Sequence, residues 1–446
     1  MRRSLIAVVT LLTGVLLTSA FVGAVAAAGT RLGPGAIEPS AAPAANGSPR
    51  SFSHLPDKEP RSQSAPSSSG CDEGEQSSGA QYRICLPSGW DGEGLVVYAH
   101  GYVAPDRPVE IPEEQMVLRW DGQSISVTEA VTGLGFAFAT TSYYTNGLAV
   151  RPAISDLLDL VDIFTTTKGT PNHVYLVGVS EGGLITALSI EEYPDVYDGG
   201  LAMCGPYGDF RGQIDHFGDF RVVFDYFFPG VMPGEPFSIP TDLMEEWESV
   251  YTQTILPTIT DASNVTAVEQ LLQVTDVSPH AYAPPTSTGS IEQLLWYNVF
   301  ATNDGVKKLG GQPFDNQDRE YSGSNDDELL NDADLGVERI TATQAAIDEI
   351  EAHYQTTGKL SVPLVTLHTT GDPVVPFWHA TRYRGKTIVA DNIALHEQLT
   401  VKRYGHCSFS ASDVLIAFQV LVDMVENPPP YRPVSRVFLP LIARAP

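Results

Sequence analysis

Basic residues are scarce in this sequence. It holds 26 Lys and Arg against 54 Asp and Glu, which gives a formal net charge of −28 at pH 7. Nucleic acids, anionic lipids and other polyanions bind to positive protein surface. The composition therefore argues against nucleic acids, anionic lipids and other polyanions as partners.

Cysteine is also rare, with four residues in a chain of 446. None stands in a C-x-x-C or Cys/His spacing typical of zinc ligands, so we expect no metal site. An even number of cysteines in an exported chain favours disulfides. Cys71 and Cys85 are close in sequence and are expected to bridge, which leaves Cys204 and Cys407 as the second pair.

Long apolar runs are confined to the N-terminus. Met1-Arg2-Arg3 precedes an apolar run that ends in small residues near Ala28, the pattern of a signal peptide over residues 1–28. An uncleaved membrane anchor is the alternative, because the run is long enough to span a bilayer. The apolar stretch 437–442 is too short for that. We expect a secreted or cell-surface protein with no stable membrane span after signal cleavage.

In the body of the chain, predicted strands alternate with predicted helices, as in an α/β protein. Residues 29–70 are rich in Ser, Pro, Ala and Gly and have too few large apolar side chains to order themselves, so they are expected to form a disordered linker. Short apolar runs then alternate with helix-like stretches, which predicts a mostly parallel sheet flanked by helices. The expected strands are 95–99, 136–141, 173–179, 200–204, 363–368 and 399–404, and the expected helices are 153–166, 183–192, 341–355 and 412–426.

Residues 205–340 interrupt this alternation of strands and helices. They contain no clear strand and lie between two late strands, where a cap or lid can be inserted without disturbing a sheet. The α/β domain is therefore expected over 71–204 and 341–426, followed by a Pro-rich tail over 427–446. Aromatic residues of the cap are expected either to line an apolar pocket or to form the cap's own core: Phe224, Tyr226, Phe227, Phe228, Trp247, Tyr251, Trp296, Tyr297 and Phe300.

The strongest chemical signal is the run Gly178-Val179-Ser180-Glu181-Gly182. It follows an apolar run and precedes a helix-like one, which is the strand-turn-helix setting of a nucleophile elbow. Gly178 and Gly182 leave room for the sharp turn. Ser180 is thereby placed near a helix N-terminus, where developing negative charge is favoured.

A serine hydroxyl becomes a good nucleophile only beside a base, here a histidine oriented by a carboxylate. Asp372 follows the expected strand 363–368, and His406 follows the expected strand 399–404. Strand ends are where open α/β sheets place their sites. We predict Asp372 as the acid and His406 as the base. The other named histidines are interpreted as follows: His368 and His379 as packing or substrate-side residues, His100 as a loop brace, and His216 and His280 as cap residues.

An acyl-transfer site also needs two backbone donors for the tetrahedral oxyanion. One is expected to be the amide of Glu181, next to the nucleophile. The other is expected to be the amide of Tyr102, because His100-Gly101-Tyr102 follows the strand 95–99 as an oxyanion loop does.

Together these segments resemble the α/β-hydrolase superfamily, and in particular secreted bacterial members with a large cap. The resemblance covers about residues 82–426 and implies an α/β-hydrolase fold whose catalytic domain carries a Ser180–Asp372–His406 triad. The turn around His406 is similar to that of feruloyl esterases and tannases, in which a cysteine beside the histidine is bridged to one beside the nucleophile. Here Val179 precedes Ser180, so Cys204 is the expected partner of Cys407.

These observations predict a serine hydrolase that cleaves carboxylic esters, small or polymeric, through an acyl-enzyme and without a cofactor. Two alternatives stay open. The same triad serves peptidases and amidases of the prolyl-oligopeptidase-like branch, and a surface-binding module can retain the fold without activity. Glu181 is either a ligand for a substrate amine or a carboxylate that complements the helix dipole. The acidic run 325–334 lacks the spacing of a known calcium loop and is interpreted as solvated surface.

Overall fold

The computed structural model describes residues 70–120, 123–277 and 286–428. These residues belong to one compact unit, Ala65–Pro446. The predictions of a signal peptide over 1–28, of a linker up to residue 69 and of a tail from residue 429 lie outside the described residues, as does His280.

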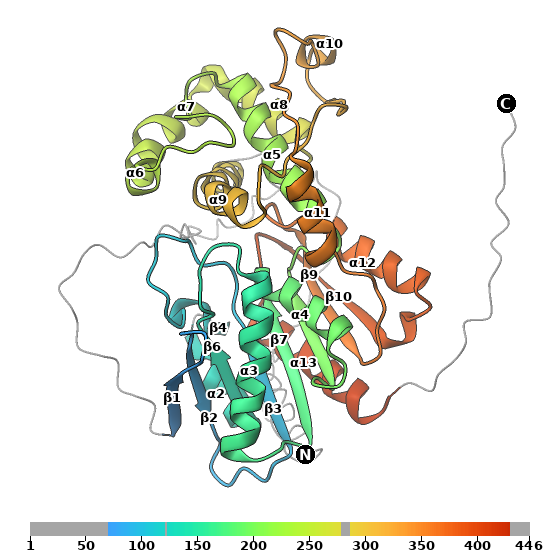
Figure 1. Cartoon of the computed structure of the whole chain (residues 1–446). Coiled ribbons are helices and arrows are strands. Elements are labelled where there is room, and N and C mark those ends of the chain that lie inside the picture. The colour runs from blue at the N-terminus through green and yellow to red at the C-terminus, as the bar shows by residue number, and fades with distance from the viewer. Residues whose placement is uncertain (1–69, 121–122, 278–285, 429–446) are drawn as a thin grey trace, which may run out of the picture. The chain divides into compact units, whose positions relative to one another are not determined.

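An eight-stranded sheet organises the described chain (Figure 1). Its strands are β1 Cys71–Glu75, β2 Gln81–Cys85, β3 Gly94–Ala99, β6 Ala137–Thr141, β7 His173–Val179, β8 Gly199–Met203, β9 Leu364–Gly371 and β10 His396–Tyr404. They lie side by side in the order β1-β2-β6-β3-β7-β8-β9-β10. The first two pairings, β1 with β2 and β2 with β6, are antiparallel, and the others are parallel. A separate hairpin joins β4 Val117–Trp120 to β5 Gln123–Ser126.

Helices bury both faces of the sheet, which is why its central strands are continuous apolar runs. On one face, α3 Val150–Lys168, α4 Glu181–Glu192 and α12 Trp378–Val389 share a core cluster with β3 and β7. On the other face, α2 Val127–Gly133 and α13 Ala411–Glu426 pack against the same strands. Every strand and helix expected in the α/β domain is present, within a few residues of its expected bounds.

The segment between β8 and β9 contains the predicted cap range 205–340 and is helical in its described part. Its helices are α5 Phe210–Phe227, α6 Leu243–Val250, α7 Leu256–Thr260, α8 Val265–Val274, α9 Thr286–Lys308, α10 Asp327–Leu330 and α11 Gln344–His353, with a π-helical turn over Tyr251–Ile255. Most of them enclose a hydrophobic cluster separate from the two at the sheet. Phe224, Phe228, Trp247, Tyr251 and Phe300 are buried in this cluster and form the cap's own core.

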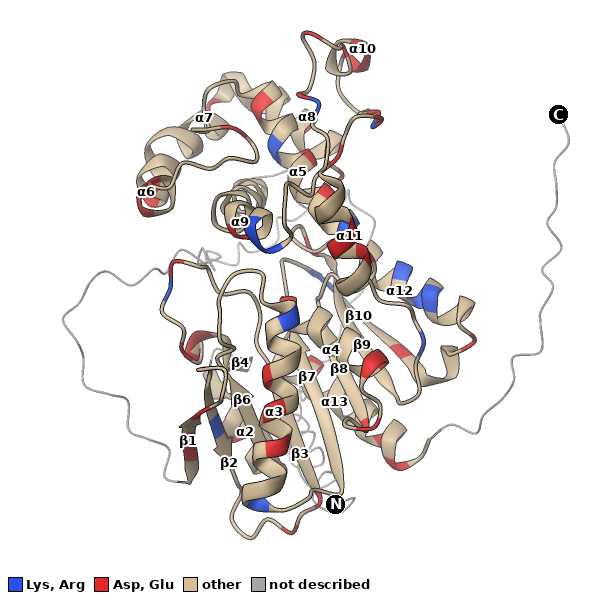
Figure 2. Ribbon diagram, viewed as in Figure 1, with Lys and Arg blue, Asp and Glu red and all other residues tan. Residues whose placement is uncertain are grey.

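Acidic residues occur on most helices, whereas α12 carries basic residues and no acidic one (Figure 2). Among the described residues, no helix combines the length and the apolar character needed to cross a bilayer.

Candidate active site

Ser180 occupies a sharp turn between β7 and α4. Its backbone has φ 57° and ψ −121°, a region that costs free energy for a residue with a side chain. The flanking glycines make this turn sterically possible. A Cβ on Gly178 would lie 2.0 Å from the carbonyl oxygen of Gly182, and a Cβ on Gly182 would lie 2.1 Å from that of Ala99. The turn therefore holds the serine hydroxyl at the carboxyl end of β7.

Ser180, His406 and Asp372 form a hydrogen-bonded chain. Oγ of Ser180 lies 2.8 Å from Nε2 of His406, and Nδ1 of His406 lies 2.8 Å from Oδ2 of Asp372. The carboxylate accepts a hydrogen bond from the N–H at Nδ1, so Nε2 presents a lone pair and the serine hydroxyl donates to it. This is the arrangement in which imidazole can remove the hydroxyl proton.

The acid is fixed by its own turn. Asp372 is 3% exposed, and its Oδ1 accepts hydrogen bonds from the amides of Val374 at 3.0 Å and Val375 at 2.9 Å. Burial alone would raise the pKa of Asp372, but the charge and hydrogen bond of His406 outweigh it and the pKa is lowered. The carboxylate is thus held ionised, which keeps the histidine tautomer fixed.

Buried histidines brace the turn that carries Asp372. Nε2 of His368 donates to the carbonyl of Val375 at 2.8 Å, and Nε2 of His216 donates to that of Pro373 at 2.9 Å. Burial lowers the pKa of both imidazoles, which favours their neutral forms. His379 contacts Gln213 instead, at 2.9 Å. These contacts are structural, and none of the three lies in hydrogen-bond contact with Ser180.

The loop after β3 brings Tyr102 beside the nucleophile. A Cβ on Gly101 would lie 3.1 Å from Cβ of Ser180, so the loop backbone passes very close to the serine. Gln115 clamps this loop from both sides, because its Oε1 accepts from the amide of Gly101 at 2.7 Å and its Nε2 donates to the carbonyl of Tyr102 at 3.0 Å. No described residue accepts a hydrogen bond from the amide of Tyr102 or of Glu181, so both donors are available for a ligand oxygen.

The structure contains two disulfides, Cys71–Cys85 and Cys204–Cys407, with the pairing expected from the sequence. The first joins the paired strands β1 and β2. The second links the residue after β8 to the residue after His406, so it ties the histidine loop to the point where the cap begins.

The side chain of Glu181 is buried at the start of α4. It is 8% exposed, and its Oε1 accepts from the amide of Ala149, at the start of α3, at 2.9 Å. Burial raises the pKa of Glu181 to about 8. This placement does not support the interpretation of Glu181 as a ligand for a substrate amine.

Two residues of the site carry no sequence motif. Gln115 lies in a short turn before β4, and Tyr297 lies on the cap helix α9. The ring of Tyr297 lies beside that of Tyr102, with centroids 5.7 Å apart. Trp296, its neighbour on α9, packs edge-on against Tyr102 with ring centroids 6.2 Å apart. Aromatic side chains of the cap therefore pack against Tyr102, in the loop that passes Ser180.

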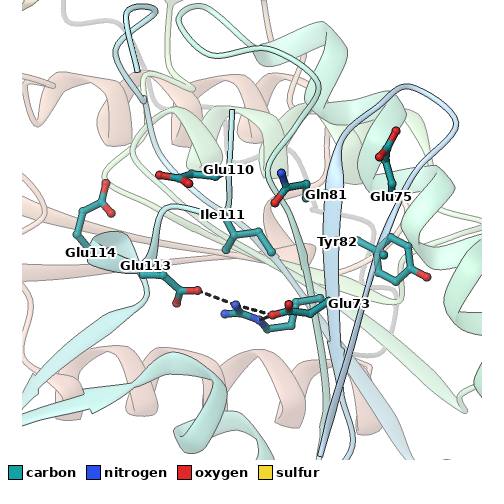
Figure 3. A pocket seen from close by; sticks show the side chains of 10 residues that line it. Glu73, Glu75, Gln81, Tyr82, Glu110, Ile111, Glu113 and Glu114 are labelled. Atoms are coloured by element: carbon teal, nitrogen blue, oxygen red, sulfur yellow. Dashed lines mark hydrogen bonds and ion pairs between the residues drawn. The ribbon is translucent and has the colours of Figure 1, made fainter. Parts of the chain in front are cut away.

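Other hollows and charge clusters lie apart from these residues. A cavity of about 660 Å³ beside β1 and β2 is lined by glutamates (Figure 3). Arg83, which also lines it, forms ion pairs with Glu73 at 2.8 Å and with Glu113 at 2.7 Å. A second, of about 420 Å³, lies between α5 and α12. Ser180, Asp372 and His406 line neither of them.

The acidic side chains of the run 325–334 accept hydrogen bonds from backbone amides of their own segment. Asp326 and Asp327 accept hydrogen bonds from backbone amides at the start of α10, and Asp332 accepts from the amides of Asp334 and Leu335. In the described part of the chain, no group of three or more His, Cys, Asp or Glu side chains is arranged to hold a metal ion.

No family model matches the sequence, and no curated protein matches it. Among solved structures, it is similar to an acylaminoacyl peptidase in complex with Z-Gly-Gly-Phe-chloromethyl ketone, with 11% identity and a TM-score of 0.39 over 79% of this chain and 40% of the peptidase. An esterase from Pyrococcus furiosus has 11% identity and a TM-score of 0.40, over 80% of this chain and 90% of the esterase. Feruloyl esterase B from Aspergillus oryzae has 14% identity and a TM-score of 0.38, over 79% of both chains. The chain spans less than half the length of the peptidase.

The assignment of the fold rests on topology. When the strands of the large sheet are counted in chain order, they lie side by side as 1-2-4-3-5-6-7-8, and helices cover both faces. The nucleophile turn follows the fifth of these strands, and the helical insertion follows the sixth. In its strand order, its strand-turn-helix elbow and the place of its cap, this chain has the α/β-hydrolase fold.

Proposed function

We propose that this protein is a secreted serine hydrolase that cleaves carboxylic esters through an acyl-enzyme. The observation that carries the proposal is the chain of contacts from Ser180 through His406 to Asp372, at 2.8 Å in both steps. The disulfides support export, because disulfides persist in oxidising compartments and are rare in the cytosol.

The proposed reaction runs in two halves. Oγ of Ser180 adds to the ester carbonyl carbon while its proton passes to Nε2 of His406, and the carbonyl oxygen becomes an oxyanion held by the amides of Tyr102 and Glu181. The intermediate then collapses, the bond to the alcohol oxygen breaks, and His406 gives its proton to the leaving alcohol. Water repeats the sequence on the acyl-enzyme and releases the acid.

The surroundings of Ser180 support an apolar or aryl-bearing ester as substrate. Tyr102 follows Gly101, whose backbone passes close to Ser180, and it packs with Trp296 and Tyr297 of the cap, while Phe217 stacks on Tyr297. Such rings bind apolar groups well and offer few partners for a charged one. The carboxyl of Glu181, next to the nucleophile, is buried, and its Oε1 accepts a hydrogen bond from the amide of Ala149. This favours an ester over an amino-terminal peptide.

The test is hydrolysis of p-nitrophenyl esters from acetate to long acyl chains, beside an amino-acyl p-nitroanilide, by the wild type and Ser180→Ala. We expect ester cleavage that falls by roughly 10⁴-fold or more in Ser180→Ala, as loss of a triad nucleophile does, and an inert anilide. Faster cleavage of the anilide would move the assignment to a peptidase or amidase. A wild type that neither turns over nor reacts with a fluorophosphonate would point to a non-catalytic binding module.

A further inference from the structure

The peptide that joins Gly101 to Tyr102 lies beside the nucleophile. A Cβ on Gly101 would lie 3.1 Å from Cβ of Ser180 and 3.0 Å from Oε1 of Gln115, so a side chain at this position would force the three apart. The side chain of Tyr102 is attached to the cap, because its hydroxyl donates to the carbonyl of Phe300 at 3.0 Å. Close contacts therefore set the position of this peptide relative to Ser180.

Three of the four backbone polar groups of Gly101 and Tyr102 have side-chain partners. The amide of Gly101 donates to Oε1 of Gln115 at 2.7 Å, and the carbonyl of Tyr102 accepts from Nε2 of Gln115 at 3.0 Å. The carbonyl of Gly101 lies 2.7 Å from Nδ1 of His100. Of the four groups, only the amide of Tyr102 has no hydrogen-bond partner among the described residues. The loop thus leaves one donor for a ligand oxygen.

The contact with His100 fixes the direction of this donor. A backbone carbonyl can only accept, so Nδ1 of His100 carries the proton and donates to Gly101. Burial lowers the pKa of His100 to about 4, so the imidazole is neutral at neutral pH. The carbonyl of Gly101 and the amide of Tyr102 belong to one planar peptide. A bond to the carbonyl therefore orients the amide as well.

Gln115 is itself held on the sheet. It ends the short turn Glu113–Gln115. The hydroxyl of Tyr98, a buried residue of β3, donates to the carbonyl of Gln115 at 2.9 Å. Arg83 of β2 pairs with Glu113, in the same turn, at 2.7 Å. The glutamine side chain thus links the peptide beside the nucleophile to two strands of the sheet.

We propose that Gln115 is a positioning residue of the oxyanion hole: its carboxamide fixes the Gly101–Tyr102 peptide so that the amide of Tyr102 faces the oxyanion. The inference rests on the proposed acyl-enzyme mechanism and adds to it the residue that keeps this donor in place. Gln115 forms no bond to the substrate. It acts on the transition state, because a donor that is aligned before the reaction costs no reorganisation when charge develops.

The two hydrogen bonds of Gln115 need both a donor and an acceptor. The amide of Gly101 can only donate and the carbonyl of Tyr102 can only accept, so the two ends of the carboxamide are not interchangeable. An ionised carboxylate in this place would keep the bond to Gly101, lose the bond to Tyr102 and put a negative charge beside its carbonyl oxygen. A protonated carboxyl would restore the donor. Protonation of a Glu at this position therefore tests the bond to Tyr102 directly.

The test is Gln115→Glu, which keeps the size of the side chain. At pH 8 we expect kcat for the preferred p-nitrophenyl ester to fall between about 10-fold and 100-fold with little change in KM, because a misplaced donor affects the transition state. The ratio of the variant's kcat to that of the wild type should rise as the pH is lowered to 5, since the protonated carboxyl donates to Tyr102 again. The ratio cancels the protonation of His406, which both proteins share.

Two further variants serve as controls. Gln115→Met removes both bonds without adding a charge, so its kcat should be low by a similar factor at both pH values, and it replaces Gln115→Glu if that variant does not fold. Gln81→Glu makes the same chemical change at an exposed position of β2 and should keep wild-type kinetics. Thermal midpoints above the assay temperature establish that the variants are folded. Wild-type kcat in both Gln115 variants, or a deficit of Gln115→Glu that is equal at pH 8 and pH 5, would overturn the inference.

A second readout separates positioning of the donor from a general loosening of the structure. A trifluoromethyl ketone that carries the preferred acyl group is attacked by Oγ of Ser180, whose proton passes to His406 while the carbonyl oxygen becomes an oxyanion. The alcohol made by reducing this ketone cannot be attacked. At pH 8, Gln115→Glu should weaken the ketone by about the same factor as kcat/KM and leave the alcohol unchanged. Equal weakening of both inhibitors, or a change in KM alone, would contradict the proposal.

These outcomes are distinct from failure of the proposed function. Activity that depends on Ser180 and not on Gln115 leaves the esterase proposal intact and removes this one. If no ester is turned over, the rate at which a fluorophosphonate labels Ser180 replaces kcat as the readout, since fluoride leaves as Oγ bonds to phosphorus and the phosphonyl oxygen occupies the oxyanion position. Gln115→Glu should then slow labelling at pH 8, and a labelling rate equal to that of the wild type would refute the role of Gln115.

Discussion

The carboxyl of Glu181 lies where a charge is costly. It is buried, one residue from the nucleophile, and its pKa is raised to about 8. In an unfolded chain the same group titrates near 4.3. Between these two values the folded state binds more protons than the unfolded state, so stability is lost as the pH rises through this window.

Glu181→Gln should therefore be more stable than the wild type at high pH. The amide oxygen of Gln can still accept from Ala149, and it never becomes charged. We expect the variant's advantage in the free energy of unfolding to grow by about 1.4 kcal/mol per pH unit across the window, to a few kcal/mol in total, and to level off above about pH 8.

Urea unfolding of both proteins at pH 5, 7 and 9 measures this difference. Glu129→Gln, at an exposed position of α2, is the control for removal of one carboxyl. A Glu181→Gln advantage that stays constant over this range would show that the pKa of Glu181 is not raised in the folded state.

At the scale of elements, the disulfide Cys204–Cys407 joins the end of β8 to the loop of His406. Replacing both cysteines by Ser should lower the free energy of unfolding by about 5 kcal/mol, because the closed loop is long. It should also lower kcat, since His406 loses the covalent restraint on its neighbour.

The Cys71–Cys85 pair provides a matched control. Its loop is short, with a sequence separation of 14, so its removal should cost about 3 kcal/mol and leave kcat unchanged. Chemical denaturation and steady-state kinetics of the two double variants, at a temperature where both are folded, make the comparison. Equal effects on kcat would contradict a role for the second bridge in holding the histidine.

The elements that the sequence predicted are those whose burial leaves a periodic or continuous apolar pattern. The central strands and α13 are examples. β1 was missed because it is an edge strand of sequence CDEGE with mostly exposed side chains. α12 was missed because its buried face includes His379, Tyr383 and Thr387, which do not form an apolar stripe.

The residues of the site also fall into a group that the sequence predicts and a group that it does not. Ser180, Asp372 and His406 each follow a recognisable strand, so their positions at one edge of the sheet could be predicted from the chain alone. Gln115 and Tyr297 belong to other elements and contact the loop of Gly101 and Tyr102 only in the folded protein. A pattern confined to neighbours in sequence carries no information about such contacts.

At the scale of the whole molecule, the formal net charge of −28 destabilises the folded state through repulsion between its negative charges. Figure 2 shows acidic residues on most helices. Salt screens this repulsion, since the Debye length falls from roughly 10 Å at 0.1 M to about 3 Å at 1 M. We expect the thermal midpoint at pH 7 to rise by a few degrees as NaCl is increased over this range.

The same salt series near the sequence pI of about 4.5 is the control, because the net charge is then close to zero and the rise should vanish. Differential scanning calorimetry measures both series. A midpoint that rises equally at the two pH values would indicate a general salt effect on burial instead of relief of repulsion.

The bridge between Cys204 and Cys407 has a further consequence for a protein exposed to proteases. Its sequence separation is 203, and the whole helical insertion between β8 and β9 lies inside the loop that it closes. A single cut in any surface loop of the cap therefore leaves two fragments still joined through sulfur. The piece bearing Ser180 stays covalently attached to the piece bearing Asp372 and His406, so a nicked molecule keeps its triad in one covalent assembly until the bridge is reduced.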